Sequence, residues 1–376
     1  MTVTSDPEFG SEFGSEFGSD FDRAMMRRCV ELAQTARGQT APNPMVGSVI
    51  VQNQDIVGEG FHPQAGQPHA EVFALWAAGE RSPGATLYVN LEPCSHFGRT
   101  PPCADAIIQA GIARVVVGMV DPNPKVAGSG IARLQAAGIA VTVGVEEALC
   151  QALNEAFVYK ILHQRPFGIL KYAMTLDGKI AATTGHSAWV TTPASRQLVH
   201  ELRAGCDAIV VGGNTVRRDN PLLTSHGVGH NPLRVVMTRQ LELPEDAKIL
   251  DVELAPTLVL TQTGAAAELQ NRLRSHGVEV LELPNLSPAA AMDILGDRSL
   301  LSVLWECGGQ LAAQAIADGS IQKVLAFIAP KIIGGSTAPS PVGDLGLTHM
   351  TDALMLERVT WRAIGADLLV EGYLEG

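Results

Sequence analysis

The chain has 376 residues, which at roughly 100–200 residues per domain favours two domains. Hydrophobic residues make up 46 % and charged residues 18 %, a composition that can bury a full core and excludes an extended disordered protein. The net charge of −12 argues against a nucleic-acid or membrane-surface binder. No membrane-spanning apolar run, secretory leader or compact cysteine framework is present. We therefore expect a soluble, cytoplasmic protein with neither nucleic acid nor membrane as partner.

The first part of the chain predicts a tail followed by a layered domain. Residues 1–19 are expected to be a disordered tail or tag, because residues 5–20 repeat a Ser-Glu-Phe-Gly unit without helical or strand periodicity. Beyond it, short β-branched runs alternate with helical spacing, which is typical of an α/β sheet with largely parallel strands. Strands are expected at 47–52, 56–61, 85–91, 114–120 and 139–144, and helices at 22–37, 69–79, 103–111, 130–137 and 146–163.

A second alternating set follows the segment His163–Pro166, where the last helix is broken. We place the domain boundary near 163–167, giving domains at 20–163 and 166–376. Strands of the second domain are expected at 168–174, 208–213, 233–238, 257–261, 278–283, 302–309 and 323–329. The sequence thus predicts two separate α/β units.

Three metal-binding side chains of the first domain lie in helix-starting contexts. His69 follows Pro68, Cys94 follows Pro93, and Cys103 follows two prolines. Since proline suits the first turn of a helix, we expect all three at helix N-termini, where the helix dipole favours a thiolate. One histidine and two cysteines leave the fourth position of a tetrahedral zinc ion open, as in catalytic sites. Glu71, two residues after His69, is placed to move protons beside the metal, as in zinc nucleobase deaminases.

Ordinary readings of these residues stay open at this point. A His-x-Glu sequence is common and is mostly solvated, and both cysteines could be inert buried thiols. The usual zinc-deaminase signature has two residues between its cysteines, whereas eight separate Cys94 from Cys103.

The first domain resembles the pyrimidine deaminase family of riboflavin biosynthesis, in which the eight-residue gap is the family's own form. The resemblance is carried by PNPMVG (42–47), GEGFH (58–62), PHAEV (68–72), LEPCSHFGRTPPC (91–103) and DPNPKVAGSG (121–130). It implies a cytidine-deaminase-like α/β/α domain, Zn²⁺ bound by His69, Cys94 and Cys103, and Glu71 as proton shuttle. The implied substrate is 2,5-diamino-6-(5-phosphoribosylamino)pyrimidin-4-one, which loses its 2-amino group. The implied substrate contacts are Asn43, His62, His96 and Asn123, although Asn43 and Asn123 also suit their proline-flanked turns.

The second domain has two strand–Gly-Gly–helix junctions, at 208–216 and 302–317. Glycines there let a backbone approach a phosphate that the helix N-terminus then binds, but neither junction is a G-x-G-x-x-G fingerprint. A third glycine pair at 334–335 could be an exposed loop. Residues alone therefore give only a weak indication of a dinucleotide site.

The second half resembles the reductase of the same bifunctional family, which has a dihydrofolate-reductase-like α/β fold. The similar segments are KYAMTLDGKIA (171–181), HSAWVTTPASR (186–196), residues 201–224 and ECGG (306–309). The resemblance implies NADPH as hydride donor for the reduction of a ribosyl to a ribityl group. The implied nucleotide contacts are Ala173, Trp189, Thr215, Asp219, Gly308 and Gly309. The implied substrate contacts are Ser187, Arg203, Leu223, His226 and Glu306, with the Arg203 guanidinium suited to a phosphate.

Two positions depart from the family's pattern. His226 stands where many relatives have an arginine, and Met237-Thr238-Arg239 stands where an Asp-Ser pair is usual. The leading hypothesis is a bifunctional enzyme acting on small phosphorylated pyrimidines, as a homo-oligomer. The alternatives are a deaminase whose reductase-like domain lacks turnover, and a nucleic-acid deaminase or binding module, which the charge and the second α/β domain disfavour.

Overall fold

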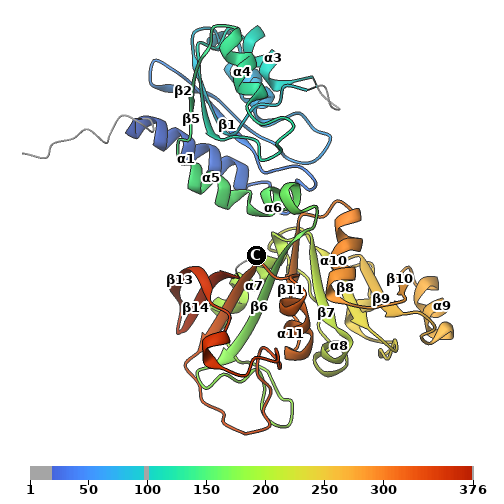
Figure 1. The fold of residues 1–376 in the computed structure, drawn as a ribbon. Coiled ribbons are helices and arrows are strands. Elements are labelled where there is room, and N and C mark those ends of the chain that lie inside the picture. Colours follow the sequence, from blue (N-terminus) through green and yellow to red (C-terminus); the bar gives the residue numbers. More distant parts are fainter. Residues whose placement is uncertain (1–18, 97–100, 375–376) are drawn as a thin grey trace, which may run out of the picture. The chain divides into compact units, whose positions relative to one another are not determined.

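The protein is represented by a computed structural model that describes residues 19–96 and 101–374. The chain divides into two compact units, one up to Val158 and one from Tyr159 onward (Figure 1). The predicted tail lies outside the described residues except for Ser19, which caps the first helix through a reciprocal pair of hydrogen bonds with Asp22. Among the described residues, no helix has the length and apolar character needed to cross a bilayer.

The first unit is a five-stranded sheet covered by helices on both faces, the predicted α/β/α arrangement (Figure 1). Its strands are β1 (Gly47–Gln52), β2 (Asp55–Phe61), β3 (Thr86–Leu91), β4 (Arg114–Met119) and β5 (Ala140–Val143). Its helices are α1 (Asp20–Gln34), α2 (Ala70–Ala78), the short η1 (Gly79–Arg81), α3 (Cys103–Gln109), α4 (Ser129–Ala136) and α5 (Glu147–Leu153), and α6 (Glu155–His163) begins here. The strand order is β2-β1-β3-β4-β5.

The expectation of a largely parallel sheet is wrong for half of this unit. Strands β3, β4 and β5 are parallel, but β1 runs antiparallel to both β2 and β3. The reason is local, because only Asn53 and Gln54, both with positive φ, separate β1 from β2, and such a short connection makes a hairpin.

Alternating side chains of the central strands fill two separate cores. Val49 and Val51 of β1 pack with Met26 and Cys29 of α1 on one face. Ile50, between them, packs on the other face with the helices α2, α3 and α4. Both faces of the sheet are therefore buried, which explains the nearly continuous apolar runs in its strands.

The predicted helix over 146–163 is two helices, because the chain breaks at Asn154. Asn154 is the C-cap of α5, with φ −106° and ψ 21°, and α6 starts at the next residue. Its side chain is 2 % exposed and bonds the backbone of Met45 instead of facing solvent. A tertiary contact that local periodicity cannot reveal therefore sets this helix boundary.

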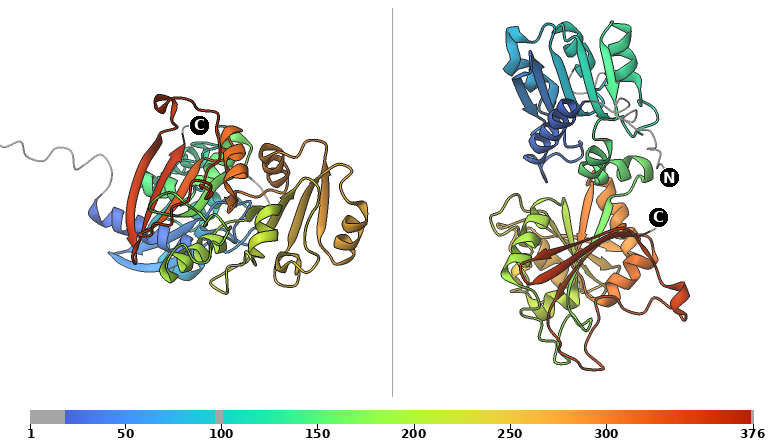
Figure 2. Two further views of the ribbon diagram at one scale, coloured as in Figure 1. Left: turned by 90° about the horizontal axis from the view of Figure 1, so that it is seen from below. Right: turned by 90° about the vertical axis from the view of Figure 1, so that its left-hand side faces the viewer.

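The second unit is built on a nine-stranded sheet of order β10-β9-β8-β7-β11-β6-β12-β14-β13. Its strands are β6 (Phe167–Thr175), β7 (Ala208–Gly212), β8 (Leu233–Thr238), β9 (Thr257–Gln262), β10 (Glu279–Leu283), β11 (Ser302–Trp305), β12 (Lys323–Ala329), β13 (Leu356–Ile364) and β14 (Asp367–Leu374). Its helices are α7 (Pro193–Ala204), α8 (Gly213–Asp219), η2 (Lys248–Leu250), α9 (Ala267–Ser275), α10 (Pro288–Asp297), α11 (Gly309–Ala317) and η3 (Met350–Asp352). All pairings are parallel except those of β14, which joins β12 and β13 antiparallel (Figure 2).

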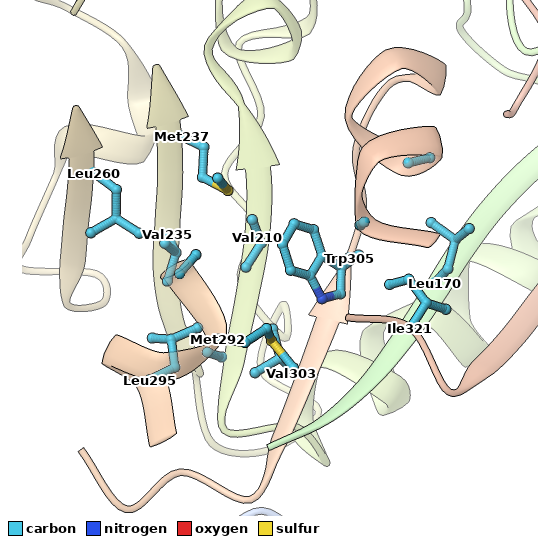
Figure 3. Close-up of a cluster of buried hydrophobic side chains, with 14 of the residues drawn as sticks. Leu170, Val210, Val235, Met237, Leu260, Met292, Leu295, Val303, Trp305 and Ile321 are labelled. Carbon is cyan, nitrogen blue, oxygen red and sulfur yellow. The ribbon is translucent and has the colours of Figure 1, made fainter. Parts of the chain in front are cut away.

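The fully buried Trp305 lies at the centre of the larger core of this unit. Figure 3 shows its ring beside Val210 of the neighbouring strand, with Met292 and Leu295 of α10 below. Trp305 ends β11, so the next residue, Glu306, emerges at the carboxyl edge of the parallel strands. In open parallel sheets this edge is where ligands bind.

Candidate active sites

The three predicted zinc ligands come together in the first unit. Nδ1 of His69 lies 3.1 Å from Sγ of Cys103 and 3.6 Å from Sγ of Cys94, and all three atoms lie within 4.8 Å of one another. Tetrahedral zinc with its usual bond lengths separates such ligand atoms by roughly 3.5–3.8 Å. The 3.6 Å separation falls in this range and the 3.1 Å one is shorter, so the donor atoms and their closeness suit a zinc ion with one open position.

The prediction that Cys94 begins a helix is wrong, because Cys94 lies in the segment after β3. In space, however, its side chain faces the first turn of α3, where its Sγ accepts a hydrogen bond from the backbone N–H of Cys103 at 3.2 Å. The neighbouring Cys103 thiol and His69 lower the pKa of Cys94 to about 4, while this thiolate and burial raise that of Cys103. His69 is the N-cap of α2 and Cys103 the first residue of α3, as predicted.

Glu71, in the first turn of α2, is buried beside this cluster with 3 % of its surface exposed. Its Oε2 has no hydrogen-bond partner among the described residues. Burial raises the pKa of the Glu71 carboxyl to about 7, because the opposing effect of His69 is smaller. A carboxyl group with a pKa near neutrality can both take up and release a proton.

A cavity of about 460 Å³ lies at this cluster, and its wall includes His69, Glu71 and Cys94 together with Asn43, His62 and His96. Nδ1 of His62 lies 3.0 Å from the Pro68 carbonyl oxygen, and its Nε2 lies 2.9 Å from Nδ2 of Asn43. Because a carbonyl only accepts, His62 donates from Nδ1 and accepts at Nε2, as a neutral ring does. Burial lowers the pKa of His62, in keeping with that neutral form.

The fourth predicted substrate contact, Asn123, is not among the residues that line the cavity. Its Oδ1 accepts from the Lys125 N–H within its own turn, so the substrate contact stays a prediction. The neighbouring Asp121 lines the cavity instead. Buried Glu92 fixes this loop by accepting hydrogen bonds from the backbone N–H groups of Asp121, Gly128, Gly130 and Ile131.

In the second unit, Glu306 forms a buried ion-pair cluster at the carboxyl edge. Arg203 Nε and Nη2 donate to its two oxygens at 2.7 and 3.1 Å, and Lys171 Nζ lies 3.3 Å from Oε2. Burial alone would raise the pKa of Glu306, but Arg203 and Lys171 outweigh it and hold that pKa at about 2. Arg203 also donates to the Thr224 carbonyl, so three of its five N–H bonds are used and two remain for a phosphate.

His226 lies in the exposed loop after α8, where its ring stacks on that of His200 at 4.2 Å. Burial, and then the charge of Arg203, lower the pKa of His226, so this ring is mainly neutral at pH 7. It is therefore a weaker anion contact than an arginine at the same position would be.

The other predicted contacts of this unit lie on β6, on α8 and on neighbouring loops. Ser187 Oγ donates to Asp219 Oδ1 at 3.4 Å. The exposed Trp189 ring lies under the Arg196 guanidinium, 4.5 Å away. Ala173 is in β6, Thr215 in α8, and the buried Leu223 follows α8 with φ +52°.

Gly308 and Gly309 differ in whether the fold itself requires a glycine at that position. Gly309 begins α11, and a Cβ there would lie 2.7 Å from the Ser340 carbonyl oxygen, so packing requires glycine. Gly308 is the N-cap of α11 with ordinary φ −73°, and a Cβ there would have no atom within 4 Å. Neither backbone nor packing requires glycine at 308, which fits close approach of a ligand to this helix N-terminus.

The third glycine pair lies in an exposed loop after β12. The backbone N–H of Gly334 donates to Oδ2 of Asp177 at 2.7 Å, so this pair holds a loop of the protein together.

Sequence reasoning missed Lys171, Glu92, Asn90 and Asn154. Lys171 and Glu92 could have been found from the sequence, because each is a charged residue within or directly after an apolar strand. The two asparagines had none, since their partners lie 45 and 109 residues away in the chain.

Comparisons with known proteins match both units. Residues 19–119 match the family model of the cytidine and deoxycytidylate deaminase zinc-binding region, and residues 166–370 match that of the RibD C-terminal domain. Riboflavin biosynthesis protein RibD of Synechocystis is 64 % identical over 94 % of this chain and 97 % of its own, and that of Aquifex aeolicus is 43 % identical over 93 % and 97 %. The crystal structure of a diaminohydroxyphosphoribosylaminopyrimidine deaminase/5-amino-6-(5-phosphoribosylamino)uracil reductase from Thermotoga maritima is 36 % identical, with a TM-score of 0.85 over 94 % of this chain and 99 % of that one.

Proposed function

The chain belongs to the RibD family of riboflavin biosynthesis, whose members join a zinc deaminase domain to a reductase domain, and from this premise we propose its substrates, cofactor and site residues. Membership disfavours both the deaminase-only and the nucleic-acid alternatives. The first unit deaminates 2,5-diamino-6-(5-phosphoribosylamino)pyrimidin-4-one, and the second reduces the resulting 5-amino-6-(5-phosphoribosylamino)uracil with NADPH. The observation that carries the proposal is the meeting of His69, Cys94 and Cys103 in one potential metal-binding group, with Glu71 in the wall of the cavity that His69 and Cys94 also line.

In the deaminase, His69, Cys94 and Cys103 hold zinc, which when bound acidifies a water molecule at neutral pH. Glu71 takes a proton from the attacking water and passes it to the leaving nitrogen, so that ammonia departs and a carbonyl forms at C2. Asn43, His62 and His96 bind the base and the ribose phosphate. The neutral ring of His62 holds the carboxamide of Asn43 in position for this contact.

In the reductase, bound NADPH would supply a hydride to C1′ of the open-chain ribosylamino group, and a proton from solvent would complete the reduction at its nitrogen. The backbone at Gly308 and Gly309, at the α11 N-terminus, would hold the phosphates of NADPH, and Ala173, Trp189, Thr215 and Asp219 would contact the rest of the nucleotide. Glu306 keeps Arg203 fixed so that its two remaining N–H bonds can meet the substrate phosphate. Ser187, Leu223 and His226 complete the substrate site.

We also carry forward the expectations of a homo-oligomer and a cytoplasmic location. Large apolar side chains such as Met350, Met355 and Trp361 are exposed on the second unit and support association between copies. Light scattering of the purified protein tests the first expectation, and cell fractionation tests the second.

The deaminase proposal is tested by zinc content and ammonia release. The purified protein should hold one zinc ion per chain and release ammonia from the diaminopyrimidine substrate, and His69→Ala should lose both. Ammonia release by a zinc-free His69→Ala protein would refute the assignment.

A further inference from the structure

The loop that carries Asn43 is not part of the sheet, and its backbone is held by two side chains far away in sequence. Residues 42–46 precede β1, and Pro42, Asn43, Pro44 and Val46 all line the cavity. Met45, between them, lies outside the strand ladder, so its N–H and carbonyl need other partners when buried.

Asn154 supplies partners for both of these groups. Its Oδ1 accepts from the Met45 N–H at 2.8 Å, and its Nδ2 donates to the Met45 carbonyl at 2.9 Å. Asn90 of β3 donates to the same carbonyl at 3.0 Å and accepts from the N–H of Gly47 at 2.8 Å. Both asparagines are buried, so these bonds do not compete with water.

The placement of Asn154 also interrupts what would otherwise be one continuous helix. The chain breaks between α5 and α6 at this residue, and one turn later Phe157 joins the cavity wall. Asn154 therefore holds Met45 at the point where the chain passes from α5 to the helix that carries Phe157.

From this geometry we infer that Asn154 is a positioning residue of the deaminase site, which acts through Met45 to set the place of Asn43 against the substrate. The inference rests on the deaminase function proposed above. The metal ligands and Glu71 lie outside this loop, at the starts of α2 and α3 and in the segment after β3, and the loop approaches them through the contact of Asn43 with His62. Loss of Asn154 therefore weakens substrate binding and leaves the metal and the proton shuttle in place.

The test compares Asn154→Leu, which removes both hydrogen bonds at similar volume, with Asn154→Asp, which keeps only the acceptor for the Met45 N–H. Both should raise the deaminase KM at least about tenfold, with kcat within about twofold and zinc content unchanged. Gln151→Leu, which removes an exposed carboxamide one turn earlier in α5, is the control and should change neither constant. A merely structural role would lower the active fraction, and hence kcat, at constant KM.

A double variant tests whether the effect passes through Asn43. Adding Asn154→Leu to Asn43→Ala should raise KM little beyond Asn43→Ala alone, because both changes remove one contact. Hydrogen exchange gives a readout without turnover, since the amides of Asn43, Met45, Val46 and Gly47 should exchange faster in both Asn154 variants while β3 and α2 stay protected. Unchanged exchange, an unchanged KM, or fully additive KM effects would overturn the inference. If wild-type protein releases no ammonia but the loop amides still exchange faster in the Asn154 variants, the proposed function is wrong while the contact of Asn154 with the loop is confirmed.

Discussion

Glu71 at the first candidate site and Glu306 at the second are both largely withdrawn from solvent, and the two carboxylates have opposite surroundings. Glu71 in the first unit has one oxygen without a partner among the described residues, and burial raises its pKa to about 7. The Glu306 side chain in the second unit is 9 % exposed, and there Arg203 and Lys171 hold the pKa at about 2 despite burial. The difference lies in the charged partners, because burial by itself raises the pKa of both carboxyl groups.

This contrast separates two uses of the same side chain. A carboxyl that titrates near neutrality can transfer a proton during a reaction, whereas a permanent anion can only hold other groups in place. We therefore assign Glu71 to proton movement and Glu306 to the organisation of Arg203 and Lys171.

The largest effect is expected from Glu71→Gln. An amide cannot carry a proton, so deaminase kcat should fall by about 10²–10⁴-fold, while the zinc content and the reductase rate stay unchanged. Ammonia release and metal analysis measure this. Deamination at the wild-type rate would show that Glu71 is not the shuttle.

The next effect is expected from Glu306→Gln. Loss of the anion leaves Arg203 and Lys171 buried without compensation, so the free energy of unfolding of the second unit should fall by about 3 kcal/mol and reductase activity should be lost. Urea unfolding followed by tryptophan fluorescence reports mainly on this unit, which holds Trp189, Trp305 and Trp361. The control is Glu245→Gln, whose partner Arg272 and own side chain are largely exposed, and which should cost under about 0.5 kcal/mol. An equal loss of unfolding free energy in Glu306→Gln and Glu245→Gln would contradict the role assigned to Glu306.

A smaller and more local effect is expected at the two glycines of α11. Gly308→Ala should leave the stability within about 1 kcal/mol but raise the KM for NADPH about tenfold, because the new methyl group points into the space we assign to the nucleotide. Gly309→Ala should instead destabilise the unit by about 1–3 kcal/mol through its clash with the Ser340 carbonyl. If the KM for NADPH were unchanged in Gly308→Ala, the assignment of the cofactor to this helix N-terminus would be wrong.

The smallest effect concerns His226. Because burial and Arg203 lower its pKa, its positive charge is lost as pH rises through values below 6.5, not across pH 6–8 as an unperturbed histidine would suggest. The reductase KM should therefore rise over that acidic range and be constant above pH 7. His226→Arg should flatten the profile and lower KM a few-fold at pH 8. If the reductase KM were independent of pH and equal in wild-type protein and His226→Arg, His226 would not contact the substrate phosphate.

The sequence predicted well what local patterns determine. Strands β1 and β8 have the bounds expected from their β-branched runs, and the metal ligands could be named because proline and helix signals surround them. It failed where tertiary contacts decide. The largely exposed strand β13 and the partly buried strand β14 went unnoticed because charged residues such as Glu357, Arg362 and Glu371 interrupt their apolar pattern.

The same limit applies to the sites. The strand expected over 302–309 ends at Trp305, because Glu306 turns to Arg203 and Lys171, two partners more than a hundred residues away. Nor could periodicity reveal that Asn154 ends a helix to hold Met45. Such pairings depend on the topology of the whole unit.

The most direct test of the two assigned roles follows ammonia and NADPH together in the intact chain. With the diaminopyrimidine substrate, wild-type protein should release ammonia and oxidise NADPH in equal amounts. Glu71→Gln should do neither, but should oxidise NADPH at the wild-type rate when given 5-amino-6-(5-phosphoribosylamino)uracil, while Glu306→Gln should release ammonia alone. NADPH oxidation by Glu71→Gln from the diaminopyrimidine, or none by wild-type protein from the uracil, would contradict the account.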